Sequence, residues 1–484
     1  MARQLGTFDV TNLVVGSIIG ADIYIAAAIG ARLVGPASLL LWVAAGVIAA
    51  VIALSFSYCT TILPRVGGPY AYAKEAVGPF AGFIVGWALL LAEWLSLAVF
   101  PVAFTQYFLS FFPNLDQFSQ VLLKIAFVAI IFATNAYGVR SAGKFNDVLT
   151  IAKLAPLLLL MASGLLFIGL HPGLAASNFQ PFAKGDLPDA GQALVLIFWA
   201  YAGFELSTLP ADEIRSPGRT IPRAIAIGML IVTSFYLVTN FVIVGVVDEV
   251  TLAASPAPLT VAAANIFGLS AGLPQIGSLV VGIGALVSIM GADESGTIGT
   301  SRLAFAMSLD GLLPRLFSKL HRSYHTPYIG LALICSTALV ASIFGTLSAL
   351  INSSVLLLSF AYLLTCVSAI LLERKHRRHH GGSRRGWLIP VLGAVFSILL
   401  MTQVAEQQIL VSSVLLAIGV PLYIFFSPKS ELREMKDAFL ARDAVLQRAY
   451  EQSERFLAHG LRHVRWVIQR AGHGEKAWKV KEGR

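Results

Sequence analysis

Six ionisable side chains lie well inside long apolar segments of the sequence: Asp22, Glu93, Lys153, Glu205, Asp293 and Glu294. A charged group in hydrocarbon is costly, so such residues usually face a partner or a polar cavity and serve a function. Five of the six are acids, so a cavity that they line would be negative if several ionise and would favour cationic groups. The set predicts the handling of protons or amines within a membrane and points away from acidic substrates.

Two glycine-containing interruptions fall within apolar segments. The first reads Gly16-Ser17-Ile18-Ile19-Gly20-Ala21-Asp22, and the second reads Trp199-Ala200-Tyr201-Ala202-Gly203-Phe204-Glu205. A broken helix frees backbone groups that hydrocarbon cannot satisfy, so the breaks must face protein or a polar cavity. Paired breaks in two halves of a chain are the best sequence indicator of a substrate site at the bilayer midplane. We predict that the substrate-binding residues are Gly16, Ser17, Ile18, Gly20, Ala21, Asp22, Trp199, Tyr201, Ala202, Gly203 and Glu205.

Other side chains near the breaks have two interpretations each. Tyr24 and Trp199 are predicted gates that cover the substrate or stack on a cation, although packing is the commoner role of a membrane aromatic. Glu93 either lines the same cavity or is a protonated acid hydrogen-bonded between helices. Neighbouring helix positions diverge by about 100°, so at most one of Asp293 and Glu294 can point squarely into a central cavity.

Composition and segment length place these residues in a membrane protein. The chain is 57% hydrophobic and 13% charged, whereas soluble domains average about 25% charged residues. Apolar blocks of 18 or more residues can span a bilayer of roughly 30 Å. We predict an all-α integral membrane protein with about twelve transmembrane helices, at residues 10–33, 37–62, 80–111, 120–138, 147–170, 191–211, 222–247, 274–306, 327–346, 347–372, 387–403 and 408–426.

The predicted helices group into a transmembrane domain and a tail. The domain, 1–426, contains two inverted repeats, about 8–170 and 191–372, each starting with a broken helix, and two further helices within 387–426. The tail, 427–484, has apolar residues at spacings of 3, 4 and 7, which is typical of an amphipathic helix. It is expected on the cytoplasmic side, where it lies on anionic lipid, pairs with another helix or packs on the protein's own face.

Basic residues indicate the orientation. With both termini in the cytoplasm, most of the 35 Lys and Arg border inner loops, and the outer side receives only Arg32, Lys124 and Lys184. This bias follows the positive-inside rule and predicts a multi-pass protein of the cell membrane. The net charge of +9 is therefore a consequence of topology, and no nucleic-acid partner is expected.

Sequence signals for metal and enzyme chemistry are lacking. Cys59, Cys335 and Cys366 lie in apolar segments without metal-ligand spacing, so we expect buried hydrophobic residues and no metal. The sequence has no phosphate-binding loop of the Gly-x-x-x-x-Gly-Lys-Ser/Thr type. It also has no recognisable pairing of nucleophile and base, so an enzyme is not expected.

Four further motifs, in order along the chain, carry a family resemblance. They are Pro64–Gly78, Asn135–Gly143, Phe204–Ala224 and Gly299–Pro314. Together they resemble loops of the amino acid–polyamine–organocation transporters, and bacterial and archaeal proton-coupled amino acid permeases in particular. The resemblance implies a LeuT-type five-plus-five inverted-repeat fold, secondary transport, and amino acids or related amines as substrates.

The resemblance suggests roles for two ionisable residues. Lys153 stands where sodium-coupled relatives of this family hold sodium, so an ammonium there disfavours sodium and could exchange a proton. A static ion pair or snorkelling to the interface is the alternative. Glu205 either exchanges protons or holds the two half-helices together by accepting backbone N–H bonds. The predicted proton-coupling residues are Lys153, Asp22, Glu205 and Glu294, with protons as the coupling ion and no cofactor.

Asp22 departs from the family pattern. The resembled transporters usually read Gly-Ser-Gly-Ile-Phe where this chain reads Gly20-Ala21-Asp22-Ile23-Tyr24. A carboxylate here competes for the N–H groups that would bind a substrate carboxylate, and it attracts an ammonium. Asp22 could pair with Lys153, bind the substrate's amine or carry protons.

The predicted function is secondary active transport of amino acids or organic amines by alternating access, coupled to protons. One alternative is an exchanger of amines, polyamines or cationic amino acids. Another is a sensor, without transport, built on a transporter fold. The expected partners are a small-molecule substrate and the lipid bilayer.

Overall fold

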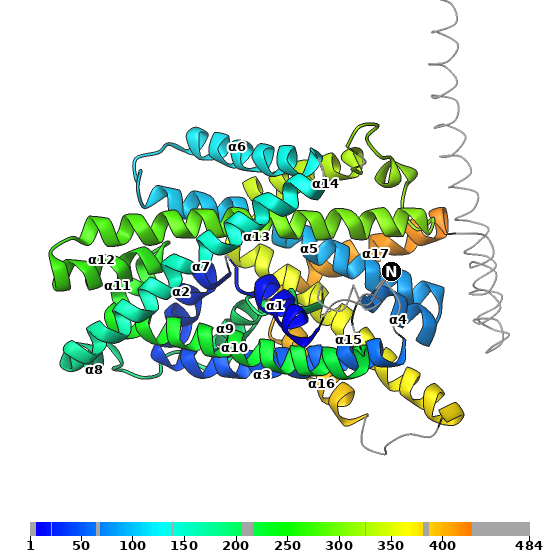
Figure 1. Cartoon of the computed structure of the whole chain (residues 1–484), viewed down its shortest axis with the longest axis horizontal. Coiled ribbons are helices and arrows are strands. Elements are labelled where there is room, and N and C mark those ends of the chain that lie inside the picture. Colours follow the sequence, from blue (N-terminus) through cyan, green and yellow to red (C-terminus); the bar gives the residue numbers. More distant parts are fainter. Residues whose placement is uncertain are drawn as a thin grey trace, which may run out of the picture. The chain divides into compact units, whose positions relative to one another are not determined.

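The computed structural model describes residues 6–20, 22–63, 68–137, 139–205, 214, 216–324, 326–380 and 387–427. The helices and 3-10 helices assigned within these ranges form the framework of the protein (Figure 1). They are α1 (Thr7–Ile18), α2 (Asp22–Val34), η1 (Gly35–Ala37), α3 (Ser38–Ile62), α4 (Gly68–Ala76), α5 (Pro79–Leu109), α6 (Gln117–Ala136), α7 (Val139–Leu170), α8 (Pro172–Asn178), α9 (Leu187–Trp199), α10 (Pro217–Val246), α11 (Glu249–Ala254), α12 (Pro258–Ala271), α13 (Pro274–Leu309), η4 (Arg315–Ser318), α14 (Tyr328–Phe344), α15 (Leu347–His380), α16 (Leu388–Thr402) and α17 (Glu406–Phe426).

Both predicted helix breaks are confirmed. The first span stops at Ile18, where Ile19 turns to an extended conformation, and resumes as α2 at Asp22. The sixth span begins as α9 at a capping box formed by Asp186 and Asp189 and stops at Trp199. The chain then continues through turns to Gly203, whose φ of +110° is a conformation that favours glycine.

The described helices have the length and surface of a multi-pass membrane protein. Seven helical stretches are long and apolar enough to cross a bilayer, or eight if Leu154–Leu170 and α8, bent by 105°, form one broken span. Large apolar side chains such as Leu166 and Leu230 are exposed on the helix surfaces, as lipid contact requires. The predicted all-α membrane class is confirmed, while α4, α8, α11 and α12 lie in segments predicted to be connections.

The core is built where helices cross at small residues. In the compact unit of residues 1–419, α5 packs on α15, α3 on α10, and α13 on both α5 and α7. Figure 1 shows α6 and α14 on one side of α13 and α3 and α10 on the other. At the crossing of α13 and α7, a methyl added at Gly284 would lie 2.4 Å from the Pro156 ring. Residues 428–484 lie outside the described part, so the amphipathic tail stays a prediction.

Candidate functional site

Residues from both helix breaks line one cavity of about 90 Å³. Six of the predicted substrate-binding residues meet there: Gly16, Gly20 and Asp22 from the first break, and Trp199, Ala202 and Gly203 from the second. The remaining wall comes from α5, α13 and α15 through Glu93, Ser96, Phe100, Ala292, Ser295, Gly296 and Leu358. The spans are thus broken where they enclose a cavity to which carboxyl and hydroxyl side chains contribute, as freed backbone groups require.

Tyr236 of α10 connects the two breaks. Its hydroxyl oxygen lies 2.8 Å from the carbonyl oxygen of Ile18, at the end of α1, and 3.0 Å from that of Ala200, just after α9. Both carbonyls belong to buried residues whose helices stop there, so one O–H group is shared between acceptors that the helices no longer satisfy. Sequence reasoning missed Tyr236, because a tyrosine in an apolar helix gives no sign of which carbonyl it reaches.

A chain of hydrogen bonds fixes Trp199 at the cavity wall. The Trp199 indole N–H donates to the Ser96 hydroxyl at 3.1 Å, and the Ser96 and Ser354 hydroxyls lie 2.9 Å apart. Ser354 itself donates to the carbonyl of Ala92 at 3.0 Å. Since each hydroxyl has one proton, the bonds run in one direction, from Trp199 through Ser96 and Ser354 to α5. The predicted gate is therefore held in place by serines that the sequence analysis did not single out.

Glu205 holds the second break together from inside. Its Oε2 accepts the backbone N–H of Gly203 at 3.1 Å and the hydroxyl of Tyr362 at 3.0 Å. Tyr362, on α15, packs edge-on against Phe56 and beside Phe204 in a buried aromatic cluster. One of the two predicted roles of Glu205, the acceptance of backbone N–H bonds, therefore has a geometric basis.

Three carboxyl groups lie close together around the cavity. Glu93 lines the cavity, and its carboxyl is near enough to those of Glu205 and Asp22 to interact with both electrostatically. Of the two interpretations of Glu93, the cavity position has a geometric basis, while a hydrogen-bonded protonated acid stays a prediction.

Other predicted site residues point elsewhere. The buried Tyr201 donates its hydroxyl to the carbonyl of Trp42 on α3 at 2.8 Å and packs against Trp42 rather than lining the cavity. The buried Tyr24 ring packs edge-on against Tyr107 of α5, whose hydroxyl donates to the Tyr24 carbonyl at 2.7 Å. Ile18 contributes its carbonyl to Tyr236.

The acidic pair on α13 does not line the cavity. Glu294 accepts a hydrogen bond from Thr134 of α6 at 2.7 Å, and Asp293 lies 3.5 Å from Thr297 on its own helix. The cavity is lined instead by their neighbours Ala292 and Ser295. Ala21 and the side chains of Ser17 and Lys153 lie outside the described residues, so their predicted roles remain predictions. Within the described part, no group of three or more potential metal-ligating side chains occurs.

Broken helices that enclose a polar cavity inside a helical membrane bundle define the class of the molecule, a multi-pass membrane transport protein. The model of the amino acid permease family matches residues 5–426, and the chain belongs to this family. The family resemblance is thus confirmed, and with it the expectation that the protein is a permease and not an enzyme.

Three relatives from Bacillus subtilis match the chain over most of its length. A branched-chain amino acid permease is 27% identical over 459 residues, covering 89% of this chain and 94% of the relative. A methylthioribose transporter is 25% identical, with 89% and 95% covered. A serine/threonine exchanger is 25% identical, with 87% and 96% covered.

Proposed function

We propose that this permease carries amino acids across the cell membrane by proton-coupled alternating access, with both termini in the cytoplasm. The observation that carries the proposal is the meeting of both helix breaks at one cavity. A volume of about 90 Å³ is below the roughly 300 Å³ at which ligand pockets usually begin. Wall side chains must therefore move to admit an amino acid, which supports a cycle of opening and closing.

The proposed recognition uses opposite chemistry for the two ends of the substrate. The carboxyls of Asp22 and Glu93 at the cavity attract an ammonium group. The N-terminus of α2 presents backbone N–H groups that can bind a carboxylate. Gly16 leaves room for the substrate's body, because a methyl added there would meet no atom within 4 Å. These features support an amino acid as the substrate and give Asp22 the amine-binding role among its three predicted ones.

The proposed proton path uses the pair of Glu93 and Glu205. In this proposal the two neighbouring carboxyls share one proton, and a substrate ammonium arriving beside Glu93 favours release of that proton. Gly203 and Tyr362 already donate to Glu205, so the pair can stay ordered after the proton leaves. In this proposal Lys153 completes the path, sodium is not required, and Glu294 exchanges protons outside the cavity.

Uptake into proteoliposomes with an inward proton gradient and no sodium tests the proposal. We expect the wild type to accumulate a labelled neutral amino acid and to lose it when the gradient is collapsed. Glu93→Gln keeps a hydrogen-bond donor toward Glu205 but cannot release a proton, so it should exchange substrate without accumulating it. Glu406→Gln, the same change at an exposed position of α17, is the control. Accumulation by Glu93→Gln at the wild-type level would contradict the proton path.

The acids at the cavity also favour a second candidate, the exchange of amines or cationic amino acids. An exchanger needs substrate inside, so preloading would stimulate its uptake, whereas a symporter accumulates substrate without preloading. If neither condition gives uptake of any amino acid or amine, the sensor hypothesis replaces both.

A further inference from the structure

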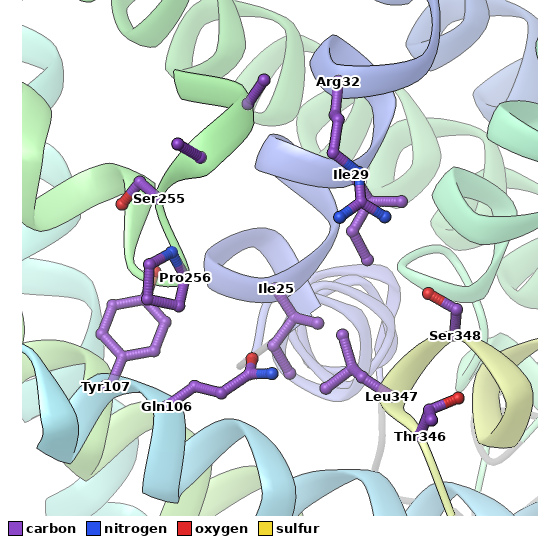
Figure 2. A pocket seen from close by; sticks show the side chains of 12 residues that line it. Ile25, Ile29, Arg32, Gln106, Tyr107, Ser255, Pro256, Thr346, Leu347 and Ser348 are labelled. Atoms are coloured by element: carbon purple, nitrogen blue, oxygen red, sulfur yellow. The ribbon is translucent and has the colours of Figure 1, made fainter. Parts of the chain in front are cut away.

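A second and larger cavity of about 320 Å³ opens at the far end of α2 (Figure 2). Its volume lies within the range of roughly 300–1,000 Å³ that small-molecule sites occupy. Its walls come from α2, the end of α5, the connection between α11 and α12, and the start of α15: Ile25, Ile29, Arg32, Gln106, Tyr107, Ala253, Ala254, Ser255, Pro256, Thr346, Leu347 and Ser348. In the sequence, Arg32 stands out only as one of the few basic residues expected on the outer side.

The two cavities follow one another along the same helices. On α2, Asp22 lines the central cavity, while Ile25, Ile29 and Arg32 line the second one. Spacings of 3, 4 and 3 residues keep these four side chains on one helix face. At 1.5 Å per residue, Arg32 is about 15 Å along the helix from Asp22. A molecule that leaves the second cavity along this face therefore reaches the central cavity next.

A tyrosine contact lies at the level between the cavities. On α5, Phe100 lines the central cavity and Tyr107, two turns later, lines the second one. The Tyr107 hydroxyl donates to the Tyr24 carbonyl of α2 at 2.7 Å, and the two rings pack at a centroid distance of 5.9 Å. This contact joins α2 to α5 at Tyr24, between the α2 residues that line the central cavity and those that line the second one.

Arg32 gives the second cavity a charge opposite to that of the central one. It is the only charged side chain among the described residues of the lining, and its guanidinium points into the space faced by Gln106 and Ser348 (Figure 2). The acids nearby on α11 have partners of their own. Glu249 pairs with Lys184, and hydrogen bonds from the Thr251 backbone and side chain hold the pKa of Asp248 below its usual value. Among the described residues no ion pair with Arg32 occurs, so its positive charge is available to a ligand.

We propose that this second cavity is a waiting site that holds an amino acid by its carboxylate at Arg32 and discriminates against substrates that lack a carboxylate. A guanidinium binds a carboxylate and repels a net cation such as an amine or polyamine. The apolar side chains of Ile25 and Ile29 can contact the substrate's side chain. This inference rests on the proposed function and narrows it, because zwitterionic amino acids pass Arg32 and then meet Asp22 with their ammonium group.

Initial uptake rates of Arg32→Gln, measured with a labelled neutral amino acid, test the proposal. Arg32 is exposed to solvent, and an exposed ion pair contributes up to about 1 kcal/mol, which corresponds to a twofold to fivefold rise in the half-saturating concentration. The maximal rate should stay unchanged, and Arg32→Lys should restore most of the affinity. The amine that corresponds to this amino acid without its carboxylate should inhibit uptake by Arg32→Gln at least as strongly as it inhibits uptake by the wild type. The difference in half-saturating concentration between the wild type and Arg32→Gln should become smaller in high salt.

Arg315→Gln, the same substitution in the exposed η4 segment, is the matched control and should leave the half-saturating concentration unchanged. An unchanged half-saturating concentration in Arg32→Gln would overturn the waiting site while leaving the proposed function intact. An equal loss of binding for the amino acid and the amine would also overturn it, because the effect would then be independent of the carboxylate. Absence of saturable amino acid uptake by the wild type would instead refute the proposed function and this inference with it.

Discussion

Tyr236→Phe tests whether one hydroxyl holds the two helix breaks in register. The substitution removes a single oxygen atom and keeps the ring, which packs against Trp42 and Tyr201 at centroid distances of 5.2 and 5.3 Å. The lost hydroxyl is bonded to the carbonyls of Ile18 and Ala200. Both carbonyls lie where a helix has stopped, so the helix itself offers them no replacement donor.

The magnitude follows from the number of acceptors that lose their donor. Leaving a buried polar group unsatisfied costs about 1–3 kcal/mol. The cavity beside the breaks is large enough for water to replace part of the lost bonding. We therefore expect the state in which the two breaks are held together to lose about 2 kcal/mol relative to the state in which they separate. This corresponds to about thirtyfold in the equilibrium constant between the two states. Thermal stability in detergent should fall, and the half-saturating concentration for uptake should rise.

Tyr24→Phe is the matched control for stability. It removes the same atom from another fully buried tyrosine, whose hydroxyl has no hydrogen-bond partner among the described residues. Its melting temperature should stay the same or rise, since the buried unpaired oxygen is gone. If Tyr236→Phe and Tyr24→Phe melt at the same temperature and Tyr236→Phe transports like wild type, the hydroxyl does not hold the breaks together.

Three glycine substitutions give further predictions. Gly16→Ala adds a methyl that meets no atom, so the melting temperature should hold while uptake of bulky amino acids weakens more than that of small ones. Gly203→Ala forces a side chain onto a φ of +110°, so it should cost about 1–3 kcal/mol and lower both melting temperature and uptake. Gly284→Ala places a methyl 2.4 Å from the rigid Pro156 ring, and a loss of about 1–3 kcal/mol should appear as reduced thermal stability. Melting curves like that of the wild type for Gly203→Ala and Gly284→Ala would contradict these two predictions.

Much of the fold was predictable because a bilayer imposes simple rules on sequence. Segment length and hydropathy predicted the seven or eight long apolar helices of the described residues, and the glycine-containing interruptions located both breaks. The short helix α12 was missed because Pro258–Ala271 is shorter than a full span and reads as a connection. Gly16 at the first break and Gly203 at the second were predictable as cavity residues because a break has to face polar groups or protein.

The sequence by itself determined that this is a helical membrane protein with two broken spans and acids beside them, because hydrocarbon penalises unsatisfied backbone and unpaired charge wherever the chain goes. Only the tertiary structure decided which side chains meet there. Tyr236 is far from both breaks in sequence, and its hydroxyl reaches Ile18 and Ala200 only because α10 packs against α1. Likewise, Tyr201 turns to Trp42, and Arg32 faces a cavity closed by α5 and α15. Such contacts depend on helix crossings, which are set by packing between distant segments and leave no local pattern in the chain.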